Sequence, residues 1–90
     1  MSVQQFTATF LGATRQKNSV NGNPVWIVHT SIGDMKSEPD SHIGHRIGSF
    51  ANPDGPDSLM GVDVLFTVFR HRSMARWVTN IQPPVSNNRL

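Results

Sequence analysis

The chain has 90 residues, 37% hydrophobic and 16% charged, which suffices for one small domain but not for two separate cores. It contains no cysteine, which excludes disulfides, thiolate catalysis and cysteine-based zinc sites. The formal net charge is only +2, yet all six acids lie within residues 34–63, so the ends are basic and the middle is acidic. No signal-peptide pattern and no membrane-length apolar run is present, so we expect a cytoplasmic protein without a membrane partner.

The first third of the chain predicts a pair of strands. Apolar and polar residues alternate over residues 6–11, and Gly12 indicates a bulge or bend. Asn21-Gly22 is a strong hairpin signal, and residues 25–30 follow as the return strand. A two-residue turn there would place Lys17 opposite Trp26 and Arg15 opposite Val28.

The middle third predicts a short strand and a short helical segment. A turn at residues 32–34 leads to a strand at residues 35–37, and Asp40 or Ser41 is the expected helix N-cap. Apolar residues then recur at helical spacing, at Ile43, Ile47 and Phe50. Because Gly44 and Gly48 disfavour helix, the segment within residues 41–50 should be only one or two irregular turns.

The last third predicts a second strand pair, residues 62–69 and 74–82, with His71-Arg72 as its turn. In that register Phe66 faces Trp77, and these two residues lead the core together with the valines. The opposite face is half apolar and is a candidate protein interface, formed by Leu65, Phe69, Met74 and Val78. The helical segment, closure of a barrel or a partner would cover it. Residues 83–90 should form a flexible tail.

The order of these elements predicts a mostly β fold in one domain, residues 1–82. We expect a small five-stranded barrel or curled antiparallel sheet, OB-like or SH3-like, with one short helical segment near residues 41–50.

Catalytic residues are not apparent. Ser49 lacks the glycine pattern of a nucleophile elbow, and His29 stands on a strand without a carboxylate nearby in the sequence. His42 and His45, close to Glu38, are the candidate metal ligands, although their spacing is not that of a known zinc site and a polar loop is the commoner interpretation. We therefore expect no enzymatic activity and no cofactor.

Basic residues lie near both predicted hairpins and beside a tryptophan. Small barrels bind single-stranded nucleic acid by combining a basic groove with aromatic stacking. The candidate nucleic-acid face consists of Arg15, Lys17, Trp26, Arg70, Arg72 and Arg76.

The run NSVNGNPVWIVHT, followed by the PDSHIGH segment and preceded by TATFLGA, resembles small, mostly uncharacterised accessory proteins of actinobacterial phages. The likeness covers about residues 5–82 and rests on turn residues and spacing; His45 departs from it, since an aromatic residue is commoner there. The resemblance implies a phage accessory protein acting in the host cytoplasm, and it assigns no site residues. The expected function is a non-enzymatic binding module that engages a host protein or itself, and the alternative is a weak single-stranded nucleic-acid binder.

Overall fold

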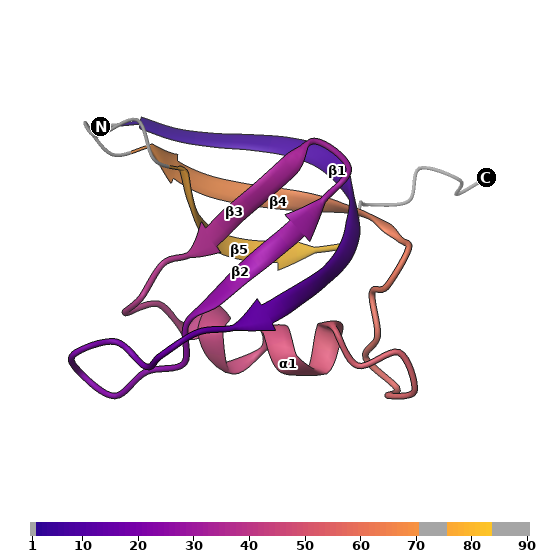
Figure 1. Cartoon of the computed structure of the whole chain (residues 1–90). Coiled ribbons are helices and arrows are strands. Elements are labelled where there is room, and N and C mark those ends of the chain that lie inside the picture. The colour runs from indigo at the N-terminus through magenta and orange to yellow at the C-terminus, as the bar shows by residue number, and fades with distance from the viewer. Residues whose placement is uncertain (1, 71–75, 84–90) are drawn as a thin grey trace.

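The computed structural model describes residues 2–70 and 76–83. Its elements, shown in Figure 1, are β1 (Ser2–Arg15), β2 (Trp26–Thr30), β3 (Gly33–Ser37), the 3₁₀ turn η1 (His42–His45), the short helix α1 (Ile47–Phe50), β4 (Asp63–Arg70) and β5 (Arg76–Gln82). The strands close into a barrel in the order β1-β2-β3-β5-β4, with β4 returning to pair with β1. The pairing of β3 with β5 is parallel and the other described pairings are antiparallel. This order, with a helical segment between β3 and β4, is the topology of the OB fold, which decides between the two predicted architectures.

Strand β1 pairs with two different strands along its length. Its first part pairs with β4 and its second part with β2, and the register shifts between Phe10 and Gly12. Gly12 has a φ of 128°, a conformation that side-chain-bearing residues rarely adopt. The bulge predicted at Gly12 is therefore confirmed, and it lies where β1 curves from one neighbour to the other (Figure 1).

The connection between β1 and β2 is longer than the predicted two-residue turn. Arg15 pairs with Trp26 and Ala13 with Val28, so the expected pairing of Lys17 with Trp26 is wrong. Residues 16–25 form a loop, whose tight turn is closed by a 2.9 Å hydrogen bond from the Gly22 N–H to the Ser19 carbonyl. We name this segment the 16–25 loop.

The barrel interior is filled by alternate residues of the strands, and η1 and α1 close one end. Phe10, Val28, Phe66 and Ile81 are fully buried. The apolar residues expected on the helical segment, Ile43, Ile47 and Phe50, are buried against this core as predicted. The predicted cap is also confirmed, since the Ser41 hydroxyl oxygen accepts a 3.3 Å hydrogen bond from the Ile43 N–H.

The register of the last strand pair differs from the prediction. Phe66 pairs with Ile81, and Trp77 pairs with Phe69 rather than with Phe66. Arg70 pairs with Arg76, so the strands are separated by residues 71–75, which lie outside the described residues together with the predicted His71-Arg72 turn and the 84–90 part of the predicted tail. Trp77 is consequently half-buried and is not part of the core. In the described part of the chain, no helix has the length and hydrophobicity to cross a membrane.

Candidate ligand-binding face

The pleat of β2, β3 and β5 places one row of side chains on the outside of the barrel. Val28 on β2, Ser37 on β3 and Val78 on β5 are fully buried, so their neighbours along each strand point outward. The strand pairing aligns these neighbours, Ile27 with Lys36 and Lys36 with Trp77. We call the surface carrying Ile27, Lys36 and Trp77 the outer face.

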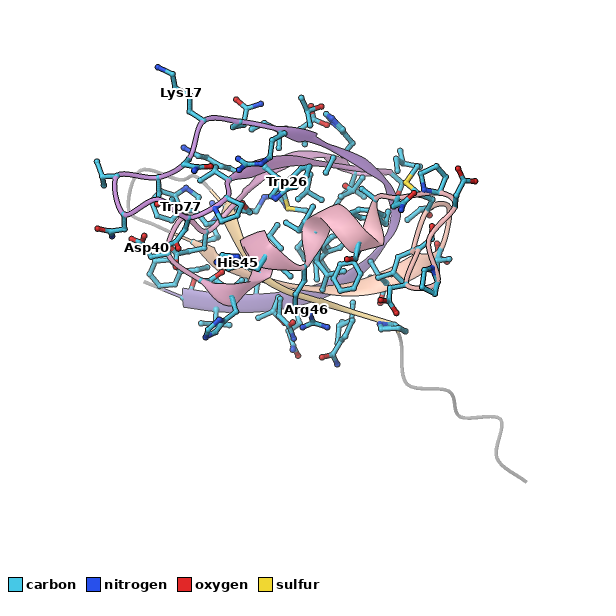
Figure 2. The ribbon with its side chains drawn as sticks, turned by 90° about the horizontal axis from the view of Figure 1, so that it is seen from below. Lys17, Trp26, Asp40, His45, Arg46 and Trp77 are labelled. Atoms are coloured by element: carbon cyan, nitrogen blue, oxygen red, sulfur yellow. The ribbon has the colours of Figure 1, made fainter. Side chains whose placement is uncertain are left out.

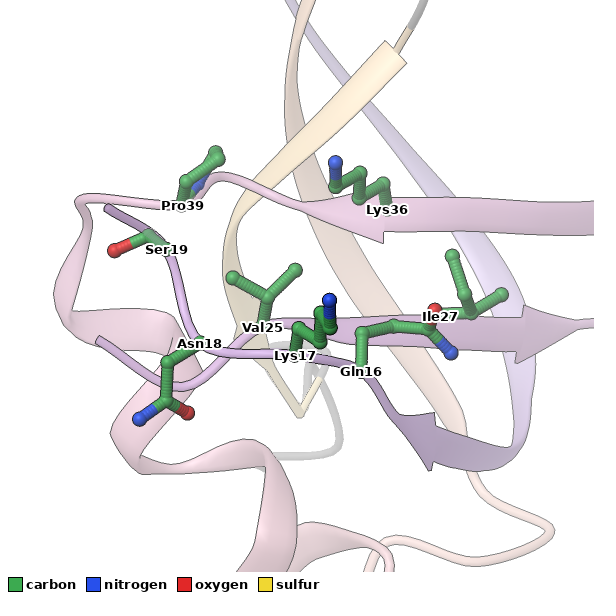
Figure 3. Close-up of a pocket in the computed structure, with 8 residues that line it drawn as sticks. All are labelled: Gln16, Lys17, Asn18, Ser19, Val25, Ile27, Lys36 and Pro39. Carbon is green, nitrogen blue, oxygen red and sulfur yellow. The ribbon is translucent and has the colours of Figure 1, made fainter. Parts of the chain in front are cut away.

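A pocket of about 370 Å³ opens where the outer face meets the 16–25 loop. Figure 3 shows Val25 and Ile27 between Lys36 on one side and Gln16 and Lys17 on the other. The pocket is lined by Gln16, Lys17, Asn18, Ser19, Val25, Ile27, Lys36 and Pro39. Val25, the last residue of the 16–25 loop, is buried but does not belong to the core cluster. The pocket therefore combines an apolar floor with a polar, basic rim.

Hydrogen bonds hold the 16–25 loop in place. Its two ends are joined by a 2.9 Å bond from the Gln16 N–H to the Val25 carbonyl. The side-chain amides of Asn21 and Asn23 both donate to the Asp40 carboxylate, at 3.1 and 3.3 Å. Asp40 lies on the segment between β3 and η1, so these bonds fasten the loop to the opposite wall of the pocket.

Arg15 and Trp26 belong to the predicted nucleic-acid face, but the structure gives them a supporting position. The Arg15 guanidinium donates to the Gln16 carbonyl at 2.6 Å and to Asn18 Oδ1 at 2.5 Å, and it lies 5.5 Å from the centroid of the Trp26 ring. The Trp26 indole N–H donates a 2.9 Å bond to the Gly44 carbonyl. Figure 2 shows Trp26 beside the helical segment, whereas Lys17 extends away from the barrel. Trp26 thus packs against the core, and Arg15 holds the loop.

The remaining predicted basic residues do not join Lys17. Arg70 and Arg76 pair across β4 and β5, and the Arg76 guanidinium lies 5.7 Å from the ring centroid of Phe6. Side chains alternate along a strand, so Arg70 points to the same side of β4 as buried Val68, and Arg76 to the same side of β5 as buried Val78. Neither residue therefore lies on the outer face. Arg72 lies outside the described residues.

The predicted apolar interface does not form one surface. Val78 is fully buried in the core, Leu65 and Phe69 are half-buried on the outward side of β4, and Met74 lies outside the described residues. The prediction that these four residues share a face assumed that Leu65 pairs with Val78. In the structure Leu65 pairs with Gln82, and Val78 pairs with Val68.

The two histidines proposed as metal ligands are exposed on η1. Within residues 2–70 and 76–83, no three His, Cys, Asp or Glu side chains are grouped so that they could hold a metal ion. His45 instead lines a second pocket, of about 250 Å³, together with Arg46, Ser49, Phe50 and Asp57.

A hydrogen-bonded row crosses β1, β2 and β3 beside the pocket. His29 Nδ1 lies 2.8 Å from Asp34 Oδ1, and His29 Nε2 lies 2.8 Å from the Thr14 hydroxyl oxygen. In the neutral imidazole, Nδ1–H donates to Asp34 and Nε2 accepts from Thr14. The Asp34 side chain is 61% exposed, so solvent weakens the electrostatic effect of this row on any neighbouring group. We therefore interpret the row as a link between strands that fixes the outer face.

The sites predicted from the sequence did not include Ile27, Asp34, Lys36 or Trp77. Asp34 was not recognised as a partner of His29 because the β2–β3 turn, rather than the linear sequence, brings the two together. Lys36 and Trp77 become neighbours only through the parallel pairing of β3 with β5. In the sequence, Lys36 stands out only as a basic residue within the acidic middle of the chain.

Comparison of the chain with protein-family models, curated proteins and solved structures gave no match.

Proposed function

We propose that the protein is a binding module that holds single-stranded nucleic acid on its outer face. The observation that supports this proposal is the pocket flanked by Lys17 and Lys36, with Trp77 next to Lys36 in the same row. In OB barrels, the surface of strands 2 and 3 and the loop between strands 1 and 2 are the usual ligand-binding region. Of the six residues in the nucleic-acid face predicted from the sequence, only Lys17 belongs to the surface proposed here.

The chemistry of the face suits a flexible, phosphate-bearing strand. Lysine ammonium groups attract phosphates, and a half-exposed indole offers a surface on which bases of any type stack. The acids near the face accept hydrogen bonds: Asp34 from His29, Asp40 from the asparagines of the 16–25 loop, and Glu38 from the backbone N–H of Asp40. With two lysines, binding should be weak, with a Kd of about 10–100 µM at low salt.

Fluorescence anisotropy with a labelled single strand of about ten nucleotides tests the proposal. Lys36→Glu should weaken binding at least about tenfold, because it reverses a charge between the pocket and Trp77. Arg46→Glu is the matched control: it makes the same charge change on the helical segment and should alter binding less than about twofold. Thermal melts check that both variants fold.

Absence of binding by the wild type at about 100 µM and low salt would contradict the proposal. Equal losses in the two variants would also contradict it, because binding would then follow net charge rather than the outer face.

A second surface favours contact with another copy of the chain. Leu11 and Ile32 are each 51% exposed, and Val62 is 41% exposed. The Met60 side chain lies beside Gly12, about 3.6 Å from the position a Cβ there would take. We call Leu11, Ile32, Met60 and Val62 the bulge patch. Leu11 lies in the bulge of β1, Met60 lies beside Gly12, the Val62 carbonyl accepts from the Phe10 N–H, and Ile32 follows Thr30, which pairs with Phe10. An apolar patch of this kind is typical of an interface.

Light scattering after size-exclusion chromatography tests self-association through the bulge patch. A concentration-dependent dimer that Leu11→Asp abolishes is the expected result. A monomer at every concentration, or a dimer unaffected by Leu11→Asp, would exclude this second function.

A further inference from the structure

The tip of the 16–25 loop carries an asparagine that is placed to react with its own backbone. Asn21 precedes Gly22, the one Asn-Gly pair in the sequence, and both residues are exposed. A backbone nitrogen attacks the preceding asparagine side chain most readily when it belongs to glycine, because no Cβ stands in the way. Gly22 has a φ of 84°, which side-chain-bearing residues rarely adopt. The turn therefore requires the residue that makes Asn21 reactive.

The reaction open to Asn21 is deamidation, and it needs no reagent except water. The Gly22 nitrogen loses its proton and bonds to Asn21 Cγ, while the Cγ–Nδ2 bond breaks and Nδ2 takes up a proton to leave as ammonia. Water then opens the resulting cyclic imide at either of its carbonyl carbons. The product is an aspartate or isoaspartate at position 21, and no group is oxidised or reduced.

The fold delays this reaction without covering the two residues. The Gly22 N–H donates the 2.9 Å bond to the Ser19 carbonyl, so its proton is held until the turn opens. The leaving group, Nδ2 of Asn21, donates to Asp40 Oδ1 at 3.1 Å. The rate of deamidation should therefore follow how often the loop opens.

Deamidation reverses the contact that fastens the 16–25 loop. At neutral pH the new side chain is a carboxylate with no hydrogen to donate, and it faces the Asp40 carboxylate. Two like charges then stand in place of a donor and an acceptor, and they repel each other. Of the two bonds from loop side chains to Asp40, the 3.3 Å bond from Asn23 remains. The fastening of the loop to the opposite wall of the pocket is thereby weakened.

We propose that Asn21 is a site of spontaneous deamidation, and that the carboxylate formed there releases the 16–25 loop from Asp40. Asn23 is a control within the same loop. It bonds to the same carboxylate, but it precedes Pro24, whose nitrogen has no proton to lose. The inference concerns the loop itself and does not depend on what the pocket binds.

Peptide mass spectrometry of the full-length protein, stored for several weeks at mildly alkaline pH, tests the chemical step. Asn21 should gain the mass difference between a hydroxyl and an amino group, with isoaspartate among the products, while Asn23 stays unchanged. Asp40→Ala frees the loop and should speed the conversion at least about threefold. No conversion in the folded protein, or a rate unaffected by Asp40→Ala, would overturn the proposal.

Amide exchange in the 16–25 loop tests the release. Asn21→Asp imitates the aspartate product, and its loop should exchange at least about threefold faster than that of the wild type. Asn21→Asp combined with Asp40→Asn swaps donor and acceptor, and should return exchange to within about twofold of the wild-type rate. Melting curves check that each variant is folded.

Exchange at the wild-type rate in Asn21→Asp, or fast exchange that persists in the double variant, would overturn the release of the loop. Neither readout involves nucleic acid. Failure of the proposed function would therefore leave this inference standing, and failure of this inference would leave the proposed function standing.

Discussion

The backbone N–H of Trp26 donates a 3.0 Å hydrogen bond to the hydroxyl oxygen of Ser37, a side chain with no exposed surface. The bond joins the start of β2 to the end of β3, directly beneath the pocket on the outer face. It gives a buried polar side chain its partner, as the interior of a barrel requires.

Replacement of Ser37 should destabilise the barrel. Ser37→Ala removes the acceptor of the Trp26 N–H and leaves that donor in a dry environment, which costs about 1–3 kcal/mol. Ser37→Thr keeps the hydroxyl and serves as the comparison, although its extra methyl group must fit the core. Urea unfolding gives the free energies, and an unchanged midpoint for Ser37→Ala would show that water replaces the bond.

Two glycines of the helical segment should respond differently to alanine. A Cβ at Gly44 would lie 2.2 Å from the Pro24 carbonyl oxygen, so Gly44→Ala forces backbone apart and should lose about 2 kcal/mol or more. A Cβ at Gly48 meets the Trp26 ring at 3.4 Å, an ordinary contact, and alanine favours helix, so Gly48→Ala should change stability by less than about 1 kcal/mol. Melting temperatures compare the two, and similar values would refute the close approach at Gly44.

Arg15 should act on binding through the loop rather than by touching the ligand. Arg15→Lys keeps the charge but loses the forked contacts to Gln16 and Asn18 and the stacking on Trp26. We expect faster amide exchange in the 16–25 loop and a severalfold loss of single-strand binding, with a loss of stability of about 1 kcal/mol. If binding is unchanged while the loop exchanges faster, the order of the loop is irrelevant to the pocket.

Salt should weaken binding only moderately. For single strands the slope of log K against log salt is about −0.7 per phosphate contact, so two or three contacts predict a slope of about −1.4 to −2. Titrations at several salt concentrations measure it. A slope near zero would rule out the lysines as phosphate contacts. A much steeper slope would require basic residues outside the outer face to contact phosphates as well.

The two tryptophans should report binding separately. Trp77 is on the outer face, whereas the indole of Trp26 is hydrogen-bonded to Gly44 and packed against the core. A base stacked on Trp77 should quench its fluorescence, and Trp77→Phe should remove most of the quenching. Quenching that persists in Trp77→Phe would place the nucleic acid near Trp26 instead.

Local patterns predicted the parts of the fold that depend on neighbours in the sequence. The bulge at Gly12 follows from one residue without a side chain, and the cap at Ser41 and the buried Ile43, Ile47 and Phe50 follow from spacing within one short segment. The barrel itself was expected from the number and order of the strands. Both hairpin registers were wrong because the lengths of the two connections were underestimated, and a register depends on that length.

The sequence by itself therefore determined a small five-stranded barrel with a short helical plug. It placed Lys17, which lines the pocket, in a candidate nucleic-acid face. Only the tertiary structure decided which tryptophan faces outward. Trp26 and Trp77 both lie on strands in which apolar and polar residues alternate, and the pairing register determines which side of the strand faces the core. The tertiary structure also brought Lys36 beside Trp77, 41 positions later in the chain, through a parallel pairing of β3 with β5 that no local pattern encodes. The outer face is a product of closure of the barrel, and so its chemistry could not be read along the chain.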